Sequence, residues 1–322
     1  MNKNYLKNNN IFKITKTKEK NPFLMWEMFG DCNFNCKECF QNFYRANAIC
    51  SVNDFKKIKQ NSKKVFLFCK KNNFRTLKVY GGEPTLLENK KMVSVLKKFK
   101  KIKNLNFEFF SNFSCDWNYF IPIIKCFKER IYLIFSFHKN GISLNNYYKK
   151  IILLLNELRK KKLKTNIVLE FTATEKNIYD LKNFLYIFET IKKNYKDFFI
   201  DVSIHEEIKL NKKHKMIYTF DVRSSKYLEK KYFNKVAKNK YNIIYNNKTE
   251  NNNINPIYNV SFKNSKCKTD GYIINLLGEL TNFCGTKIII KNFFNSNVKK
   301  IILEDYMMCE SSCCWWWFSE VK

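Results

Sequence analysis

The chain has 322 residues, of which 45% are hydrophobic and 17% aromatic, so apolar side chains suffice for a large buried core. This composition excludes a globally disordered chain, whose apolar content could not offset the entropy of ordering. Lysine and arginine number 60 against 28 acidic residues, which gives a formal net charge of +32. A nucleic-acid partner is the alternative that this charge leaves open. It is not favoured, because the lysines are spread along the chain rather than gathered in one tail.

Twelve cysteines are present, and they gather towards the two ends of the chain, as sets of metal ligands do. The first 20 residues are rich in Lys and Asn and contain no apolar signal-peptide core. No apolar run approaches the roughly 18 residues that a membrane span needs. These features predict a protein of the reducing cytoplasm that does not contact a membrane. In that compartment clustered cysteines bind metal rather than form disulfides.

A polar tail over residues 1–22 precedes the first predicted strand, the apolar run 23–28. Three cysteines follow within eight residues, Cys32, Cys36 and Cys39, with the spacing C-x3-C-x2-C. Thiolates are ligands for zinc and for iron–sulfur clusters. Three protein ligands instead of four leave one metal position open, and an open position is where chemistry occurs. A zinc knuckle or three unrelated buried cysteines are the alternatives.

Strand and helix patterns alternate after the cysteine loop. A helix is predicted to follow Ser51 as N-cap, and a strand over 77–80 leads into Gly81-Gly82-Glu83-Pro84. Paired glycines let the backbone approach a ligand closely, since no Cβ intervenes. Apolar runs predict further strands at 106–110, 131–138, 166–171 and 198–204, and periodic patterns predict helices at 89–102, 116–127, 143–158 and 175–193. Six near-continuously apolar strands with intervening helices predict an α/β fold with a buried parallel sheet.

The cysteine loop and the Gly-Gly-Glu-Pro turn together resemble the motifs of the radical S-adenosylmethionine (SAM) enzymes. The resemblance covers about residues 23–207 and implies a partly open (β/α)6 barrel. It implies that Cys32, Cys36 and Cys39 hold a catalytic [4Fe–4S] cluster whose open iron binds the amino and carboxylate groups of SAM. An electron from such a cluster cleaves SAM to methionine and a 5′-deoxyadenosyl radical. Where the family usually has an aromatic residue before the third cysteine, this chain has Glu38, so Phe34 or Phe40 is expected to contact the adenine.

The chemistry of parallel α/β barrels lies at the C-terminal ends of their strands. This rule nominates side chains just after the predicted strands, namely Ser111, Asn112, Ser136, His138, Thr172 and His205. The resemblance implies that SAM is bound by Gly81, Gly82, Glu83, Pro84, Ser111, Asn112 and Ser136. His138 is included with this cofactor-binding set. It and His205 are also candidates for substrate contact or acid–base chemistry, with a structural, hydrogen-bonded histidine as the alternative for each.

A second cysteine set lies near the C-terminus. Cys267 and Cys284 flank a predicted β-hairpin with Gly278 at its turn, so closure brings both sulfurs to one end. Cys309, Cys313 and Cys314 offer the remaining ligands, and which of the adjacent pair binds is left open. Four thiolates hold either a [4Fe–4S] cluster or a zinc ion. The set is similar to the auxiliary-cluster extension of radical SAM enzymes in its short, twitch form, as opposed to the longer SPASM form.

Four segments are therefore expected: the tail 1–22, the radical SAM core 23–207, a Lys- and Asn-rich connection 208–266 and an auxiliary-cluster domain 267–322. The resemblance implies an enzyme whose radical abstracts hydrogen from a peptide, protein or small-molecule substrate, with a peptide favoured. It also implies a reductase or flavodoxin-type electron donor. The charge motivates one alternative, an RNA-modifying radical SAM enzyme. A non-catalytic zinc or iron–sulfur scaffold is the other.

Overall fold

The structure is a computed structural model. It describes residues 22–36, 39–43, 45–139, 141–173, 180–206, 209–210, 216–217, 266–268, 271–282, 288–296, 307–308 and 320–321. The chain divides into two compact units. The larger comprises Asn21–Ile217 with Asp270–Leu303, and the smaller comprises Met1–Lys20, Tyr218–Thr269 and Glu304–Lys322.

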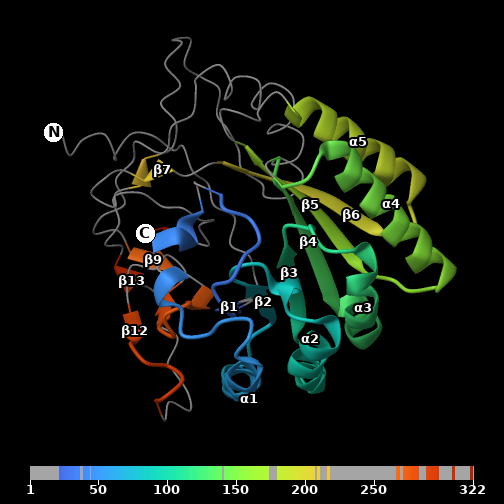
Figure 1. The fold of residues 1–322 in the computed structure, drawn as a ribbon. Helices are drawn as coiled ribbons and strands as arrows, with labels where there is room; N and C mark the ends of the chain where they lie inside the picture. The colour runs from blue at the N-terminus through green and yellow to red at the C-terminus, as the bar shows by residue number, and fades with distance from the viewer. Residues whose placement is uncertain are drawn as a thin grey trace. The chain divides into compact units, whose positions relative to one another are not determined.

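The larger unit is built on a nine-stranded sheet with the order β12-β11-β10-β1-β2-β3-β4-β5-β6 (Figure 1). Strands β1 to β6 pair in parallel and in chain order, which confirms the predicted α/β fold. The sheet is open, with β12 and β6 at its edges. The strands are β1 (Phe23–Glu27), β2 (Thr76–Tyr80), β3 (Asn106–Ser111), β4 (Ile131–Phe137), β5 (Asn166–Ala173), β6 (Phe199–Glu206), β10 (Gly271–Ile274), β11 (Leu280–Asn282) and β12 (Ile288–Ile290). A separate two-stranded sheet pairs β7 (Lys209–Leu210) with β8 (Met216–Ile217).

Five α-helices connect the parallel strands and lie along one face of the sheet (Figure 1). They are α1 (Phe55–Asn72), α2 (Asn89–Leu96), α3 (Ile121–Phe127), α4 (Leu144–Lys160) and α5 (Leu181–Asn194). Short 3-10 turns flank them: η2 (Phe40–Phe43), η3 (Arg45–Asn47), η4 (Pro84–Leu86), η5 (Lys97–Lys101), η6 (Trp117–Phe120) and η7 (Lys128–Arg130). The predicted cap at Ser143 is confirmed, because its hydroxyl accepts a hydrogen bond from the Asn146 N–H at 3.3 Å.

Several helix boundaries differ from the predicted ones; α3, for example, begins at Ile121 after the 3-10 turn η6 and not near residue 116. Asp54 rather than Ser51 occupies the N-cap position of α1, without a side-chain capping hydrogen bond, and the Ser51 N–H donates to the Asp54 carboxylate at 3.0 Å. The segment that continues α2 tightens into the 3-10 turn η5 instead of extending the α-helix to residue 102. These differences lie at helix ends, where local hydrogen bonds compete with the α-helical pattern.

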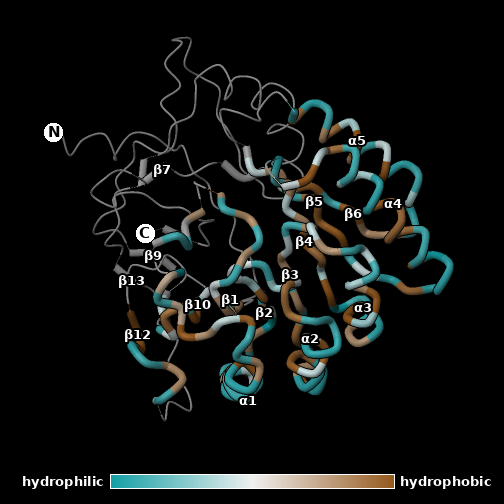
Figure 2. The backbone as a smooth tube through the Cα atoms, viewed as in Figure 1, coloured by the Kyte–Doolittle hydropathy of each residue, from teal (hydrophilic) through white to brown (hydrophobic). Residues whose placement is uncertain are grey.

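The core lies between the sheet and the helices. Buried residues alternate with less buried ones in β2, where Leu77 and Val79 are buried, and in β3, whereas β1 and β4 are buried along most of their length. Successive strand side chains point to opposite faces, so this alternation puts one face of each strand against the helices. Figure 2 shows the hydrophobic residues in the strands and the hydrophilic ones on the outer sides of the helices. The opposite face of the sheet carries more polar residues, including an ion pair of 2.9 Å between Lys78 and Glu108.

The predicted hairpin around Gly278 is confirmed as the antiparallel pair β10–β11. Its strand β10 also pairs in parallel with β1, so the hairpin extends the large sheet beyond β1. The buried carboxylate of Glu27, at the end of β1, accepts a hydrogen bond from the Leu276 N–H at 2.9 Å. The N-terminal strand is thus held by a segment 249 residues later in the chain.

In the smaller unit, the described residues form one three-stranded antiparallel sheet. Strand β9 (Lys266–Lys268) lies between β13 (Met307–Met308) and β14 (Glu320–Val321). The backbone of Cys267 pairs with Met307 on one side and Val321 on the other. Two later segments of the chain thus flank one cysteine-bearing strand.

Candidate functional site

The cysteine loop leaves the C-terminal end of β1 and is anchored to the end of β2. The N–H of Met28 donates to the Tyr80 carbonyl at 2.9 Å, and the N–H of Glu83 donates to the Asp31 carbonyl at 2.8 Å. The loop then turns tightly, with the Cys39 N–H bonded to the Cys36 carbonyl at 3.2 Å. The loop therefore lies at the C-terminal ends of the parallel strands, the edge at which the chemistry of such folds is expected.

The Cys32 sulfur lies near two N–H donors. The backbone N–H of Phe34 donates to it at 3.4 Å, and the side-chain amide of Asn112, just after β3, approaches at 3.9 Å. The same amide donates to Asn33 at 2.9 Å, so Asn112 ties the cysteine loop to the third strand. Burial is the main cause that raises the pKa of the Cys32 thiol. A bound cation or metal would favour the thiolate form of this buried side chain.

The other two cysteines also have nitrogen atoms close to their sulfurs. His138 Nδ1, just after β4, lies 3.8 Å from the Cys36 sulfur. The Arg45 guanidinium donates to the Cys39 sulfur at 3.2 Å. Each of the three sulfurs is thus within reach of at least one N–H group or ring nitrogen from a different segment. None of the three is in a disulfide.

The Gly81–Gly82 pair packs against the start of the cysteine loop. Both glycines have positive φ, +97° and +51°, which residues with a Cβ rarely adopt. A Cβ on Gly82 would overlap the Asp31 carbonyl, and one on Gly81 would lie 2.9 Å from Glu27 Cα. The Gly82 N–H donates to the side-chain oxygen of Gln41 at 2.9 Å. The close backbone approach predicted for a ligand is made here to the cysteine loop itself.

The Glu83 carboxylate connects β2 to β3. One oxygen accepts from the Thr85 N–H at 3.0 Å, the Thr85 hydroxyl at 2.6 Å and the Ser111 hydroxyl at 2.9 Å. The other accepts from the Asn112 N–H at 2.6 Å. Burial raises the pKa of this carboxyl, and the four donors act in the opposite direction. In this structure the carboxylate therefore positions Ser111 and Asn112.

Ser136 on β4 has a partner that the sequence analysis did not nominate. Its hydroxyl donates to the Glu170 carboxylate at 2.5 Å. The two residues are register neighbours on β4 and β5, and Ser203 on β6 follows in the same row. This row lies on the sheet face opposite the helices, because the alternate residues Phe135, Leu169 and Val202 are buried against them.

Comparison with known proteins gives two findings. Residues 23–121 match the family model of the 4Fe-4S single cluster domain, and this segment contains the three cysteines and the Gly-Gly-Glu-Pro turn. The structure resembles that of the radical SAM enzyme anSMEcpe with bound AdoMet, with a TM-score of 0.50 and 13% identity over 86% of this chain and 76% of that one. The chain has the radical SAM fold.

The same enzyme with bound AdoMet and the Cp18Cys peptide gives a TM-score of 0.49 at 14% identity, over 86% of this chain and 78% of that one. None of the curated proteins matches the sequence significantly. The predicted radical SAM resemblance is confirmed by the family model and the fold, and the family model supports the predicted [4Fe–4S] cofactor. In the part of the chain that the structure describes, none of the helices has the length and apolarity to cross a bilayer.

Some of the residues predicted to contact SAM are described by the structure, and others lie outside its described part. The Phe34 ring packs on Gly141 and meets His138 edge-on, with 5.9 Å between ring centroids. Pro84 is buried at the start of η4. The predicted residues whose side chains lie outside the described part are Phe40, His205 and Cys267, and Glu38, Cys284, Cys309, Cys313 and Cys314 lie outside it entirely. The ligand set of the auxiliary cluster therefore stays a prediction.

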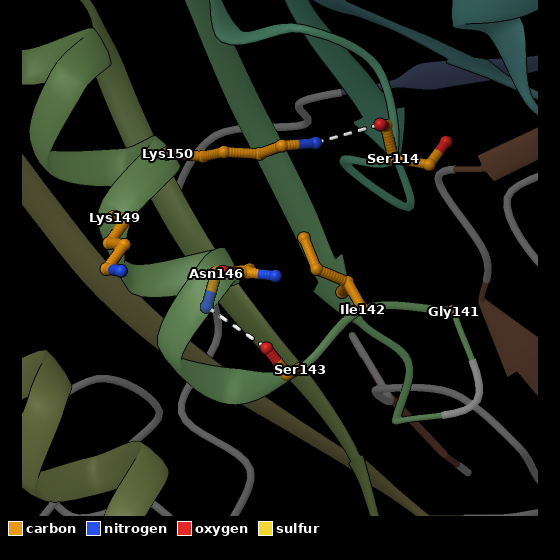
Figure 3. A pocket seen from close by; sticks show the side chains of 7 residues that line it. All are labelled: Ser114, Gly141, Ile142, Ser143, Asn146, Lys149 and Lys150. Atoms are coloured by element: carbon orange, nitrogen blue, oxygen red, sulfur yellow. Dashed lines mark hydrogen bonds between the residues drawn. The ribbon is translucent and has the colours of Figure 1, made fainter.

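A pocket of about 390 Å³ opens beside the cysteine loop, between the segment after β3 and the start of α4 (Figure 3). Lys150 on α4 reaches across it and donates to the carbonyls of Phe113, Ser114 and Cys115 at 3.2, 2.8 and 2.8 Å. Phe113 has a φ of +55°, which is unfavourable for a residue with a Cβ. Lys150 thereby stabilises the strained turn that follows Asn112.

Two unsatisfied donors beside the cysteine loop fit a bound cluster that carries acceptor atoms. Among the described residues, no group of three or more His, Cys, Asp or Glu is arranged to hold one metal ion. Two buried donors beside the loop, Arg45 Nε and Gln41 Nε2, have no hydrogen-bond partner within the described part of the chain. Unsatisfied buried donors of this kind are costly unless an acceptor such as cluster sulfide is present.

Sequence reasoning missed Arg45, Gln41, Glu170 and Lys150. Arg45 and Gln41 follow the third cysteine within six residues. The positive charge of Arg45 so close to the predicted cluster ligands was the one sequence feature that could have indicated a contact with them. Glu170 was visible as a carboxylate within an apolar strand. Lys150 carried no signal, because it is one of many lysines on helix surfaces.

Proposed function

We propose that this chain is a radical SAM enzyme in which Cys32, Cys36 and Cys39 hold a catalytic [4Fe–4S] cluster. The observation that carries the proposal is the set of three thiols, each with its own nitrogen partner, in the segment that matches the 4Fe-4S family model. A cluster bound there supplies the electron that cleaves SAM reductively to methionine and a 5′-deoxyadenosyl radical.

The surrounding residues have positioning roles in this proposal. Gly81 and Gly82 bring the end of β2 against the cysteine loop, and Glu83 fixes Ser111 and Asn112 beside it. Ser136 and Glu170 form a polar pair on the sheet face that the helices leave free, where SAM hydroxyls would find both a donor and an acceptor. His138 and Phe34 pack together next to Cys36 and shield that side of the loop.

We further propose the finer features that the sequence predicts. The substrate is a peptide or protein, and the C-terminal cysteines Cys267, Cys284, Cys309, Cys313 and Cys314 provide the ligands of an auxiliary [4Fe–4S] cluster. A flavodoxin-type reductase supplies the electron, and the protein works in the cytoplasm. The support is the resemblance of the cysteine spacing to the auxiliary-cluster extension.

The deciding experiment measures 5′-deoxyadenosine formed from SAM by anaerobically reconstituted protein with dithionite. The wild type forms it, and Cys36→Ala lowers the yield at least a hundredfold because the cluster loses one of three ligands. Cys126→Ala, at a cysteine on α3 away from the loop, serves as the matched control and keeps the wild-type yield. Full activity of Cys36→Ala would refute the assignment.

A pool of random synthetic peptides should raise the yield of 5′-deoxyadenosine. Stimulation by total RNA instead would favour the RNA-modifying alternative.

A further inference from the structure

Arg45 is a charged residue directly beside a proposed cluster ligand. Its guanidinium lies 3.2 Å from the Cys39 sulfur, closer than the Asn112 and His138 nitrogens lie to theirs, at 3.9 and 3.8 Å. The guanidinium is positively charged at every working pH, whereas an amide and a neutral imidazole offer only a dipole. Arg45 is therefore the one side chain of these three that brings a permanent full charge to a sulfur.

The Arg45 side chain is fixed in place. Gly30 lies so close that a Cβ there would be 3.2 Å from Arg45 Cγ and 2.9 Å from Ala48 Cβ. The Arg45 carbonyl accepts the Ala48 N–H at 3.1 Å within the short turn η3. Its Nε is buried and has no hydrogen-bond partner among the described residues. A buried donor on a fixed guanidinium beside a thiol indicates an acceptor that joins the Cys39 sulfur when the site is loaded.

We infer that Arg45 sets the reduction potential of the catalytic cluster. This inference rests on the proposed function. Reduction adds one electron, and so one negative charge, to the cluster, and a nearby cation stabilises that added charge. Hydrogen bonds to ligand sulfurs and net charge are two established determinants of cluster potential. Arg45 acts through the cluster rather than on the substrate, so it is a positioning and tuning residue.

Three substitutions separate the charge of Arg45 from its hydrogen bond. Arg45→Lys keeps the charge, Arg45→Gln keeps N–H donors without the charge, and Arg45→Met removes both. Arg159→Met is the matched control, because Arg159 lies at the exposed C-terminal end of α4 and pairs there with Asp197. The midpoint potential of each anaerobically reconstituted protein is measured by EPR-monitored titration, with iron content recorded. The Cys32→Ala/Cys36→Ala/Cys39→Ala variant supplies the signal of any auxiliary cluster for subtraction.

Arg45→Met should lower the equilibrium constant for one-electron reduction about tenfold, which corresponds to a potential about 59 mV more negative. Arg45→Gln should shift in the same direction, and Arg45→Lys and Arg159→Met should stay closer to the wild type. Iron-loaded Arg45→Met and Arg45→Gln with the wild-type potential would overturn the inference. So would folded variants that cannot hold iron, because Arg45 would then act in cluster retention. A wild type that binds no iron would instead refute the proposed function.

Discussion

The Glu83 carboxylate is a buried charge-bearing group with four protein donors, and those donors come from its own turn and from the end of β3. Because both oxygens accept hydrogen bonds, the carboxylate connects the turn after β2 to the end of β3. This is a structural role that the Gly-Gly-Glu-Pro motif alone does not reveal. The geometry that it imposes extends through Asn112 to the Cys32 sulfur. A single side chain thereby couples the second strand, the third strand and the cysteine loop.

Glu83→Gln should destabilise the cofactor-free protein by about 2 kcal/mol, because an amide nitrogen then faces the Asn112 N–H and leaves a buried donor unsatisfied. The measurement is urea denaturation followed by circular dichroism. Glu88→Gln is the control, since Glu88 is exposed and its partner Lys91 lies at 3.5 Å, and it should change stability by less than about 0.5 kcal/mol. Equal effects of the two substitutions would show that the four hydrogen bonds contribute nothing specific.

At the scale of elements, η5 docks on α1 through a lysine. Lys98 on η5 donates to the Ser62 hydroxyl of α1 at 2.7 Å. Burial, with smaller contributions from the charges of Lys63 and Lys59, lowers the pKa of Lys98 from its usual 10.5 to about 8. Between about pH 8 and pH 10.5, the folded-state and unfolded-state pKa values, the unfolded chain binds more protons at this residue than the folded chain does. The free energy of unfolding therefore rises with pH across that interval.

Lys98→Met should stabilise the protein below pH 8, and the gain should fade as the pH approaches 10.5, because the folded wild type no longer holds a disfavoured charge there. The gain is about 1 kcal/mol or less, since the side chain is only half-buried and solvent screens it. Stability is measured by urea denaturation at several pH values. Lys101→Met, an exposed lysine of the same turn, should show no such pH-dependent difference. A gain that is constant with pH would contradict the linkage and indicate simple apolar packing.

The parallel strands and the hairpin could be predicted because each is a local pattern. The runs at β1, β3 and β4 are apolar and bounded by polar or glycine residues, and Gly278 marks the hairpin turn. The pairing of β10 with β1 could not be predicted, because parallel pairing between distant segments leaves no local signal. Helix ends were missed where a side chain such as Asp54 competed with the α-helical pattern.

The candidate site divides in the same way. Cys32, Cys36, Cys39 and the paired glycines were found because a motif has a fixed spacing. The partners of the sulfurs depend on how loops after three different strands are folded against one another, and spacing carries no information on that. Arg45 lies six residues after Cys39, yet only the turn of η2 and η3 brings its guanidinium to the sulfur.

For the whole molecule, the two cysteine sets predict the iron content. Reconstituted wild type should hold about eight irons per chain, as two [4Fe–4S] clusters, and the Cys32→Ala/Cys36→Ala/Cys39→Ala variant should hold about four. Iron and zinc are measured together by metal analysis, with Cys126→Ala as the control. Four irons with one zinc in the wild type would assign the C-terminal set to a zinc site instead.

The pairing of β1 with β10 also affects the order of events while the chain is being synthesised. The Leu276 N–H that donates to the Glu27 carboxylate lies 249 residues later in the chain. The edge of β1 that pairs with β10 therefore remains unpaired on the ribosome for tens of seconds at usual elongation rates. The cysteine loop is synthesised early, but until β10 is made it follows a strand, β1, that can pair only with β2. We therefore expect cluster delivery to follow synthesis of β10, and a nascent chain stalled before β10 to be a poor acceptor of iron and sulfide.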